Sequence, residues 1–286
     1  MRNPVLIDAP SNLGLRPPAE GAVPGCYKTP GVLRDLGILR RLGAADGGVV
    51  TPGRYVGTWQ PGDGVRNAAA LAAYTRALAE RVTAVRSSGG FPVVLGGDCS
   101  ISLGAMLALR RAGRYGIAYV DGHDDFRHLG VAEHVDAAAG EDLAIMTGRG
   151  ERGLADIDGL RPYVRDEDVL VLGVRSAESA DVRAAGIAHV TSEAIMASGL
   201  TLSSPFEGLD GFWLHLDIDV LDPAYVSAVD SPDPGGLDPD TLVPVLRQLL
   251  SLPGAAGFEL TVFDPDLDPD GRQAALVADI LERALR

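Results

Sequence analysis

The sequence predicts an α/β fold in which helices cover both faces of a mostly parallel sheet. Short apolar runs typical of strands alternate with segments of helical periodicity along the 286 residues. Such alternation is typical of βαβ units, whose strands are parallel. No internal repeat, low-complexity tract or linker interrupts the sequence, which predicts a single domain over residues 1–286. The hydrophobic content of 46% is sufficient for a large core.

The individual elements follow from these periodicities. Apolar runs predict strands at 4–8, 92–95, 116–121, 169–174, 187–190, 212–218 and 256–262. Helical periods predict helices at 30–42, 65–87, 100–112, 178–185, 192–199, 239–252 and 272–285. Asp238 and Pro239 are residue types preferred at the N-cap and first position of a helix, so they support the start of the helix at 239–252.

The composition excludes several classes of partner. A formal net charge of -14 and a pI near 4.7 argue against binding to nucleic acid or to an anionic membrane. Cys26 and Cys99 are too few to form a disulfide framework. No apolar run reaches about 18 residues, so no transmembrane helix is expected. The short apolar run before Asp8 is not a signal-peptide core. We therefore expect a cytoplasmic protein.

Two acidic motifs follow strand-like runs. Asp121, His123 and Asp125 come after the run at 116–120, and two further carboxylates come after the run at 212–216, at Asp217 and Asp219. Because side chains alternate along a strand, the members of each motif can share one face. Carboxylates that converge at strand ends repel one another unless a cation lies among them. Two divalent cations about 3.5–4 Å apart would satisfy this arrangement.

A glycine-rich turn supplies another candidate ligand. Cys99 lies in the turn Gly96-Gly97-Asp98-Cys99-Ser100, between a predicted strand and a predicted helix. An isolated cysteine is commonly a small buried apolar residue, but a shared sheet edge with the acidic motifs favours metal ligation here. Structural zinc sites use four Cys or His ligands. An oxygen-rich set with one His and one Cys instead indicates manganese, iron or cobalt in an open catalytic site.

Three histidines allow two interpretations each. His215 alternates in phase with Asp217, so it is either a hydrogen-bonded core histidine or a residue that supports the ligands from beneath. His128 and His134 lie in the loop after the first motif, where they are either solvated or able to carry protons near the metal site.

The motifs together resemble those of the arginase/agmatinase (ureohydrolase) family. The resemblance includes Leu-Gly-Gly-Asp-x-Ser at 95–100, Asp-x-His-x-Asp at 121–125, Asp-x-Asp-x-x-Asp-Pro at 217–223 and Phe-Asp-Pro at 263–265. It implies a three-layer α/β/α fold with a mostly parallel central sheet. It also implies two manganese ions, hydrolysis of a guanidino C–N bond, a small guanidino substrate, and a homo-oligomer that is a trimer or hexamer.

The resemblance also implies a role for each motif residue. One metal would be held by Cys99, Asp121, Asp125 and Asp217. The other would be held by Asp121, His123, Asp217 and Asp219. A hydroxide between the metals would attack the guanidino carbon, and Asp125 would orient it and then carry a proton to the leaving amine.

The metal-binding turn departs from the family pattern. Cys99 stands where the family has His. A thiolate makes the centre more negative, and a more negative centre is a weaker Lewis acid. Such a centre suits an N-hydroxyguanidine, and the cysteine resembles the branch of the family that hydrolyses N-omega-hydroxyarginine.

The substrate side departs as well. Glu141 and Asp142 occupy the region of the family's proton-relay His, so either is a candidate relay. Val262 stands where the family has the Glu that grips the guanidinium, and Glu259, Thr261 and Asp264 are nearby substitutes. Arg127 and His134 lie in the loop after the first motif and are predicted to contact the substrate.

These observations predict a two-metal amidinohydrolase acting on a guanidino or N-hydroxyguanidino compound, for example hydroxyarginine or arginine. One alternative is a hydrolase of the agmatinase or guanidinobutyrase type. Another is a metal-binding protein without catalysis, which the altered relay and guanidinium positions favour. The intact Asp/His ligand set argues against it, because unused buried charges are costly to keep.

Overall fold

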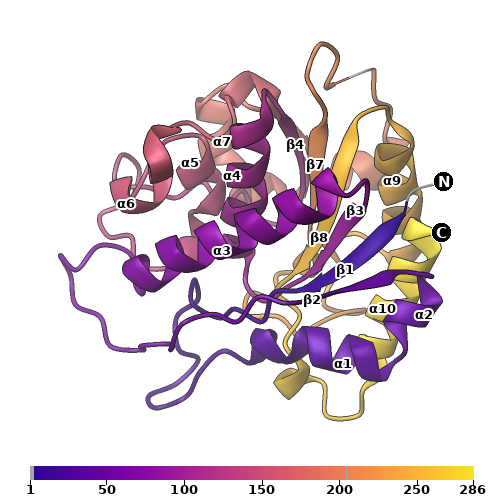
Figure 1. Cartoon of the computed structure of the whole chain (residues 1–286), viewed down its shortest axis with the longest axis horizontal. Coiled ribbons are helices and arrows are strands. Elements are labelled where there is room, and N and C mark those ends of the chain that lie inside the picture. The colour runs from indigo at the N-terminus through magenta and orange to yellow at the C-terminus, as the bar shows by residue number, and fades with distance from the viewer. Residues whose placement is uncertain (1–2, 204) are drawn as a thin grey trace.

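The computed structural model describes residues 3–203 and 205–286 and contains one eight-stranded sheet in which every pair of neighbouring strands is parallel (Figure 1). The strand order across the sheet is β2-β1-β3-β8-β7-β4-β5-β6. The strands are β1 (Pro4–Asp8), β2 (Ala45–Val49), β3 (Phe91–Leu95), β4 (Gly116–Val120), β5 (Val169–Val174), β6 (Ala188–Thr191), β7 (Phe212–Asp217) and β8 (Ala255–Thr261).

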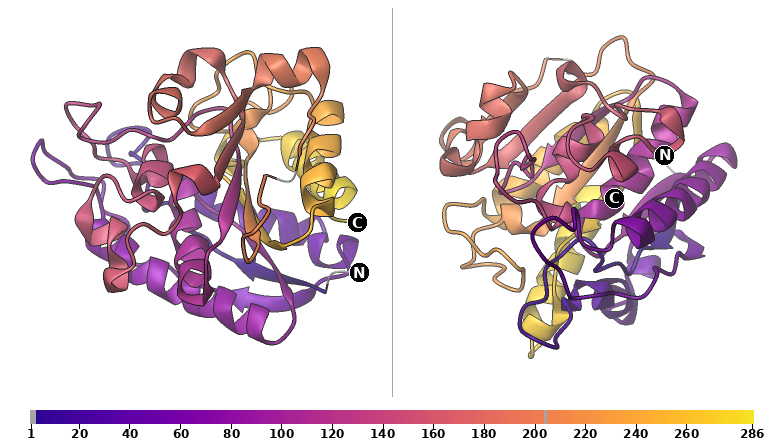
Figure 2. Two further views of the ribbon diagram at one scale, coloured as in Figure 1. Left: turned by 90° about the horizontal axis from the view of Figure 1, so that it is seen from above. Right: turned by 90° about the vertical axis from the view of Figure 1, so that its left-hand side faces the viewer.

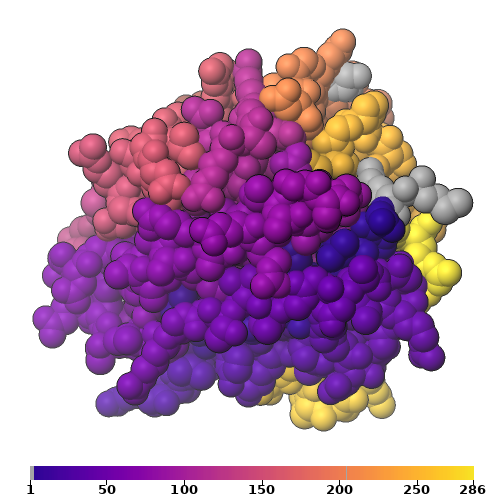
Figure 3. Space-filling view, viewed as in Figure 1, coloured from indigo at the N-terminus to yellow at the C-terminus, as the bar shows by residue number. Residues whose placement is uncertain are grey.

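Helices cover both faces of the sheet, which confirms the predicted α/β fold (Figures 1 and 2). One face packs against α3 (Ala68–Ser87), α4 (Ser102–Ala112), α5 (Asp142–Met146), α6 (Arg152–Ala155) and α7 (Ala180–Ala184). The other packs against α1 (Thr29–Asp35), α2 (Ile38–Arg41), α8 (Ser192–Ser198), α9 (Pro239–Ser251) and α10 (Arg272–Leu285). The N-terminal third of the chain, including α3, forms most of the surface turned to the viewer in Figure 3.

The core is divided between the two faces by alternation along each strand. On β7, Leu214 and Leu216 belong to the apolar cluster beneath α9 and α10, whereas Trp213 belongs to the cluster beneath α3 and α4. All six residues of β7 are buried. Burial on both faces explains why the central strands are nearly continuous apolar runs in the sequence.

Most predicted elements lie within a few residues of their expected positions, and the exceptions have local causes. The strand β2 was not predicted, because Ala-Asp-Gly-Gly-Val has no apolar run; it is an edge strand paired only with β1. The single helix predicted at 30–42 was wrong: Gly37, with φ 75°, separates α1 from α2. The helix expected from residue 65 begins at Ala68, because Asn67 has φ 57°.

The predicted cap of α9 is confirmed, since the side chain of Asp238 accepts a hydrogen bond from Thr241 N (2.7 Å) and Pro239 is the first helical residue. At the end of β3, Asp98 similarly accepts from Ser100 N (3.0 Å). Both caps fix the direction in which the chain leaves a strand or enters a helix. Among the described residues no helix has the length and apolarity needed to cross a bilayer.

The order of the central strands decides where the acidic motifs lie. The strands β3, β8, β7 and β4 are consecutive across the sheet, and Val120 is in register with Leu216. The first carboxylate of each motif, Asp121 and Asp217, is the next residue along its strand. Both motifs are therefore neighbours at the carboxyl edge of the sheet, where parallel sheets bind ligands.

Candidate metal centre

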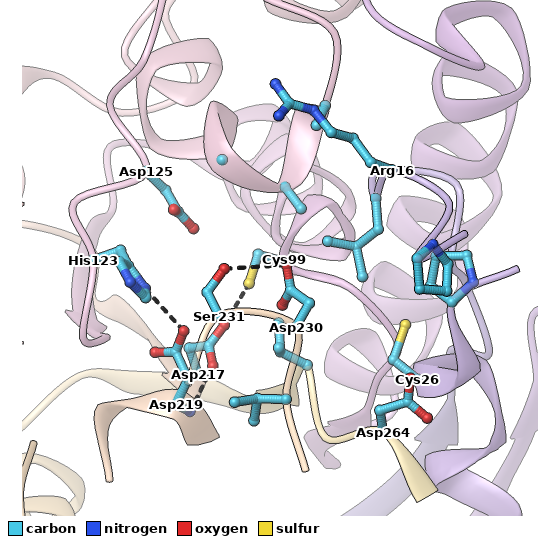
Figure 4. Close-up of a pocket in the computed structure, with 18 of the residues that line it drawn as sticks. Arg16, Cys26, Cys99, His123, Asp125, Asp217, Asp219, Asp230, Ser231 and Asp264 are labelled. Atoms are coloured by element: carbon cyan, nitrogen blue, oxygen red, sulfur yellow. Dashed lines mark hydrogen bonds and ion pairs between the residues drawn. The ribbon is translucent and has the colours of Figure 1, made fainter. Parts of the chain in front are cut away.

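Two groups of potential ligand atoms meet at this edge. Figure 4 labels four of their residues, namely Cys99, His123, Asp217 and Asp219. The first group is Cys99, Asp121, His215 and Asp217, all of them buried, and the second is Asp121, His123 and Asp219. Within each group the ligand atoms lie within 4.8 Å of one another. Asp121 belongs to both groups, so the geometry can hold two neighbouring cations that share one carboxylate.

Short-range hydrogen bonds hold the carboxylates in place. Asp121 Oδ1 accepts from His123 N (2.7 Å), and Asp217 Oδ1 accepts from Asp219 N (2.8 Å). In both motifs an aspartate therefore bonds the backbone two residues later, a turn that Asp favours. Cys99 Sγ donates to Asp217 Oδ2 at 2.7 Å. The turn after β3 is thereby tied to the end of β7.

The electrostatics of the centre fit a bound cation. Burial raises the pKa of Asp121 and, further, of Asp217, and the charge of Asp219 raises both. Burial and the Asp217 charge also raise the pKa of the Cys99 thiol. Asp121 Oδ2 is buried and has no hydrogen-bond partner within the part of the chain that the structure describes. Divalent cations would remove this repulsion and satisfy the free oxygen, so the residues present suit a metal centre.

His123 is held between two carboxylates. Its Nδ1 lies 2.9 Å from Asp219 Oδ2, and its Nε2 lies 2.9 Å from Asp233 Oδ2. Burial lowers its pKa, but the hydrogen bond and charge of Asp219 outweigh this effect and raise the pKa to about 11. A metal ion binds neutral imidazole, so metal binding at this group must release a proton and must strengthen as the pH rises.

Asp125, predicted as a ligand, lies outside both groups. It has φ 40°, and its Oδ2 accepts a hydrogen bond from Tyr119 Oη (2.9 Å). The same hydroxyl lies 2.8 Å from Asp142 Oδ1. Asp142 is wholly buried and also bonds Ser102. Asp125 and Asp142 are therefore joined through one tyrosine, and this link was not predicted from the sequence.

A cavity of about 880 Å³ opens above the metal centre. Members of both ligand groups line it, namely Cys99, His123, Asp217 and Asp219. Asp125, the relay candidate Glu141 and the predicted substrate contacts Arg127 and Asp264 line it as well. In Figure 4, Arg16 lies at the opposite side of the cavity from His123. The cavity thus has potential metal-ligating side chains at its floor and other charged side chains around its wall.

Glu141 is the predicted relay residue that reaches this cavity. It is 1% exposed, and neither carboxylate oxygen has a hydrogen-bond partner among residues 3–203 and 205–286. Burial raises its pKa to about 8. The side chain is therefore protonated over much of the neutral range and can give or accept a proton near pH 8.

Glu141→Gln is expected to stabilise the protein increasingly as the pH rises from about 5 to about 8. An unfolded glutamate ionises near pH 4.5, whereas the folded one stays protonated until about pH 8, so the wild type loses stability across this window. Gln does not titrate. We expect a gain on the order of 2 kcal/mol at pH 8 relative to pH 5, measured by urea unfolding of both proteins. If the free energies of unfolding of the variant and the wild type differed by the same amount at pH 5 and pH 8, this result would contradict the raised pKa of Glu141.

Two predicted substrate contacts lie elsewhere. Glu259 is wholly buried in β8 and bonds His215 (2.8 Å) rather than lining the cavity, so we correct its assignment as the residue that grips a guanidinium. His134 is also absent from the cavity wall: it is exposed and packs edge-on against Trp59. Glu259 is in register with His215, two residues below the level of Asp217 at the carboxyl edge of the sheet, and a substrate in the cavity cannot reach it.

Other residues that shape the site were missed. Arg175 is buried after β5, and its guanidinium donates to the carbonyl oxygens of Asp219 (2.8 Å) and Asp233 (2.6 Å). It therefore fixes both loops that hold His123. Its own position, directly after an apolar strand, was the available signal. Asp233 had none, because it lies 14 residues beyond Asp219 in an irregular loop.

Sequence similarity places this arrangement in a known family. Residues 26–286 match the family model described as Arginase family. The chain belongs to the arginase family. The resemblance carried by the motifs is confirmed at this level, and the ligand cluster is consistent with the two-metal dependence of the arginase family.

Relatives within the arginase family differ in activity. The chain is 29% identical to the arginase of Bacillus caldovelox over 270 residues, which cover 88% of this chain and 89% of that protein. It is 32% identical to a formimidoylglutamase of Halobacterium salinarum over 263 residues, which cover 83% and 80%. The solved arginase of Bacillus caldovelox superposes with a TM-score of 0.87 at 27% identity and covers 100% of this chain and 98% of that one.

Proposed function

We propose that the chain is a two-metal amidinohydrolase that cleaves the C–N bond of a guanidino or N-hydroxyguanidino compound. The observation that carries this proposal is the pair of ligand groups sharing Asp121 at the floor of a large cavity. Carboxylate and imidazole donors of this kind suit manganese. When bound, the metal ions would supply Lewis-acid activation of water and substrate.

The residues of the chain would divide the remaining work. Asp125 faces the cavity beside the ligands and would orient water and move a proton to the leaving amine. Tyr119 holds the Asp125 carboxylate through its hydroxyl, and Asp142 supports the tyrosine. Burial and the charge of Asp121 raise the pKa of Asp125 well above its usual range, which favours proton uptake by this carboxylate. Glu141 would exchange protons between the cavity and solvent.

The altered positions favour a substrate other than a simple guanidinium. Val262 is 3% exposed and cannot pair with a cation, so a guanidinium would have to pair with other acidic groups of the wall, among them Glu141, Asp230 and Asp264. If metal binding removes the proton of Cys99, a thiolate would lie beside Asp217, and this anionic ligand would make the first group less able to activate a basic guanidinium. An N-hydroxyguanidine, which is less basic, fits this wall better.

A second candidate is hydrolysis of a formimidoyl amino acid. The 32% identical relative is named a formimidoylglutamase. A formimidoyl group is smaller than a guanidino group and has a C–H in place of one NH2, so it offers fewer N–H donors to a carboxylate at the position of Val262. The third candidate is a hydrolase of the agmatinase or guanidinobutyrase type, whose guanidino substrate lacks the complete amino-acid end of arginine. Agmatine and guanidinobutyrate test this candidate.

A panel of substrates tests these proposals. Manganese-loaded protein is incubated with arginine, hydroxyarginine, agmatine, guanidinobutyrate and formimidoylglutamate, and urea, hydroxyurea and formamide are measured. We expect hydroxyurea from hydroxyarginine at a rate at least about tenfold above urea from arginine, equivalent to about 1.4 kcal/mol. Formamide as the dominant product would support the second candidate. Stoichiometric metal without turnover of any compound would overturn the proposed activity and favour a metal-binding protein without catalysis.

A further inference from the structure

His215 lies directly beneath the metal centre. It is wholly buried in β7 and is two residues before Asp217, so both side chains lie on the same face of the strand. Among the described residues its Nε2 has no hydrogen-bond partner, and it lies 3.8 Å from Asp121 Oδ2, which also has none. Buried polar atoms are normally paired, because an unpaired one loses its hydrogen bonds to water without a replacement. Two unpaired buried atoms that face each other indicate that something binds between them.

The other side of the imidazole is fixed. His215 Nδ1 lies 2.8 Å from Glu259 Oε1, and the two residues are in register on β7 and β8. Tyr119, on the neighbouring strand β4, stacks against the face of the imidazole ring, with the ring centroids 4.2 Å apart and an angle of 8° between the ring planes. A carboxylate on one ring nitrogen selects the tautomer in which Nδ1 carries the proton, and it leaves Nε2 free as a donor to metal.

We propose that His215 Nε2 is a ligand of the first metal, in a set made of Cys99, Asp121, His215 and Asp217, with Glu259 as the positioning residue. This inference rests on one part of the proposed function, namely that a metal ion binds at the first ligand group. The set differs from the one expected from sequence, in which Asp125 was the fourth ligand. In this set His215 supplies the imidazole that is missing because Cys99 stands where the family has His.

The distances agree with this assignment. Two ligand atoms that are each about 2.1 Å from one ion lie about 3–4 Å apart, and His215 Nε2 is 3.8 Å from Asp121 Oδ2. Separations of this size are too long for a hydrogen bond. The set combines sulfur, nitrogen and oxygen, so the first site should accept cobalt or zinc more readily than the carboxylate-rich second site.

Cobalt substitution tests the assignment without using activity. Metal-free protein labelled with ¹⁵N histidine is loaded with Co²⁺, and the imidazole N–H signals are recorded by NMR. We expect hyperfine-shifted signals from both His123 and His215, since only rings bound to the paramagnetic ion shift strongly. His215→Gln should remove one signal and lower bound cobalt from about two to about one per chain. His189→Gln, on the distant edge strand β6, is the matched control and should retain both.

Glu259→Gln distinguishes a positioning residue from a packing residue. Gln keeps the size and the acceptor for Nδ1–H but removes the charge, so the fold should survive, as checked by circular dichroism. Cobalt affinity at the first site should fall about tenfold or more, as it does when such partners are changed. An unchanged affinity would contradict the role of Glu259.

The outcomes separate this inference from the proposed activity. Bound cobalt with an unshifted His215 signal would overturn the ligand assignment alone. A shifted His215 signal without turnover of any substrate would overturn the activity alone. Failure to bind cobalt, manganese or zinc would overturn both.

Discussion

Asp121→Asn is expected to remove both metal ions and to reduce hydrolysis on the order of 10³-fold or more. Asp121 belongs to both ligand groups, and its Oδ2 has no partner besides the proposed metals. Asn retains one oxygen but loses the charge that balances the cations. The metals are worth several kcal/mol of transition-state stabilisation, and each 1.4 kcal/mol corresponds to about tenfold in rate. Elemental analysis and steady-state kinetics measure the two effects.

The neighbouring Asp124→Asn is the matched control for this variant. Asp124 is a carboxylate in the same loop, but it belongs to neither ligand group and instead accepts from Phe126 N (3.2 Å) and Val182 N (3.3 Å). It should retain both metals. If Asp121→Asn also retained both, the shared carboxylate would not be essential and the two-metal arrangement would need revision.

Gly97→Ala is expected to destabilise the protein by about 3 kcal/mol or more. A Cβ atom at this position would collide with the backbone of Ser11, chiefly its carbonyl oxygen. That oxygen accepts from Asp98 N (3.1 Å), and Gly97 O accepts from Val262 N (2.7 Å). These hydrogen bonds hold the backbone of both Ser11 and Gly97, so neither segment can move away without losing one of them. Because Cys99 follows in the same turn, the variant should also weaken metal binding.

Urea unfolding of the metal-loaded variants measures this effect, with Gly31→Ala as the control. Gly31 lies in α1 with no atom near the position of an added Cβ. Ala should be neutral there or stabilise the helix by about 0.5–1 kcal/mol. A loss below about 1 kcal/mol for Gly97→Ala would show that the turn adjusts more easily than the packing indicates.

Local rules identified much of the candidate site. Asp121, His123, Asp217 and Asp219 were predicted as ligands because each motif follows an apolar strand and alternates with period two. All four lie in the two ligand groups. The same reasoning located the α9 cap, since a helix N-terminus depends only on a few consecutive residues.

Residues that depend on a partner from another strand were not predictable in this way. His215 had two open interpretations until β8 placed Glu259 beside it and β4 placed Asp121 above it. Asp125 was expected among the ligands, but its positive φ and the Tyr119 hydroxyl turn it outside both groups. The edge strand β2 forms because β1 offers it a hydrogen-bonding edge, although its own residues have little preference for a strand.

Periodicity and capping act over a few neighbouring residues, so they were enough to predict a parallel α/β sheet with acidic motifs at its carboxyl edge. Which donors can share an ion, which acid lines the cavity and which acid is buried became clear from the folded arrangement alone. Those choices depend on the order and register of β3, β8, β7 and β4, and this order is set by the packing of the whole sheet rather than by any segment.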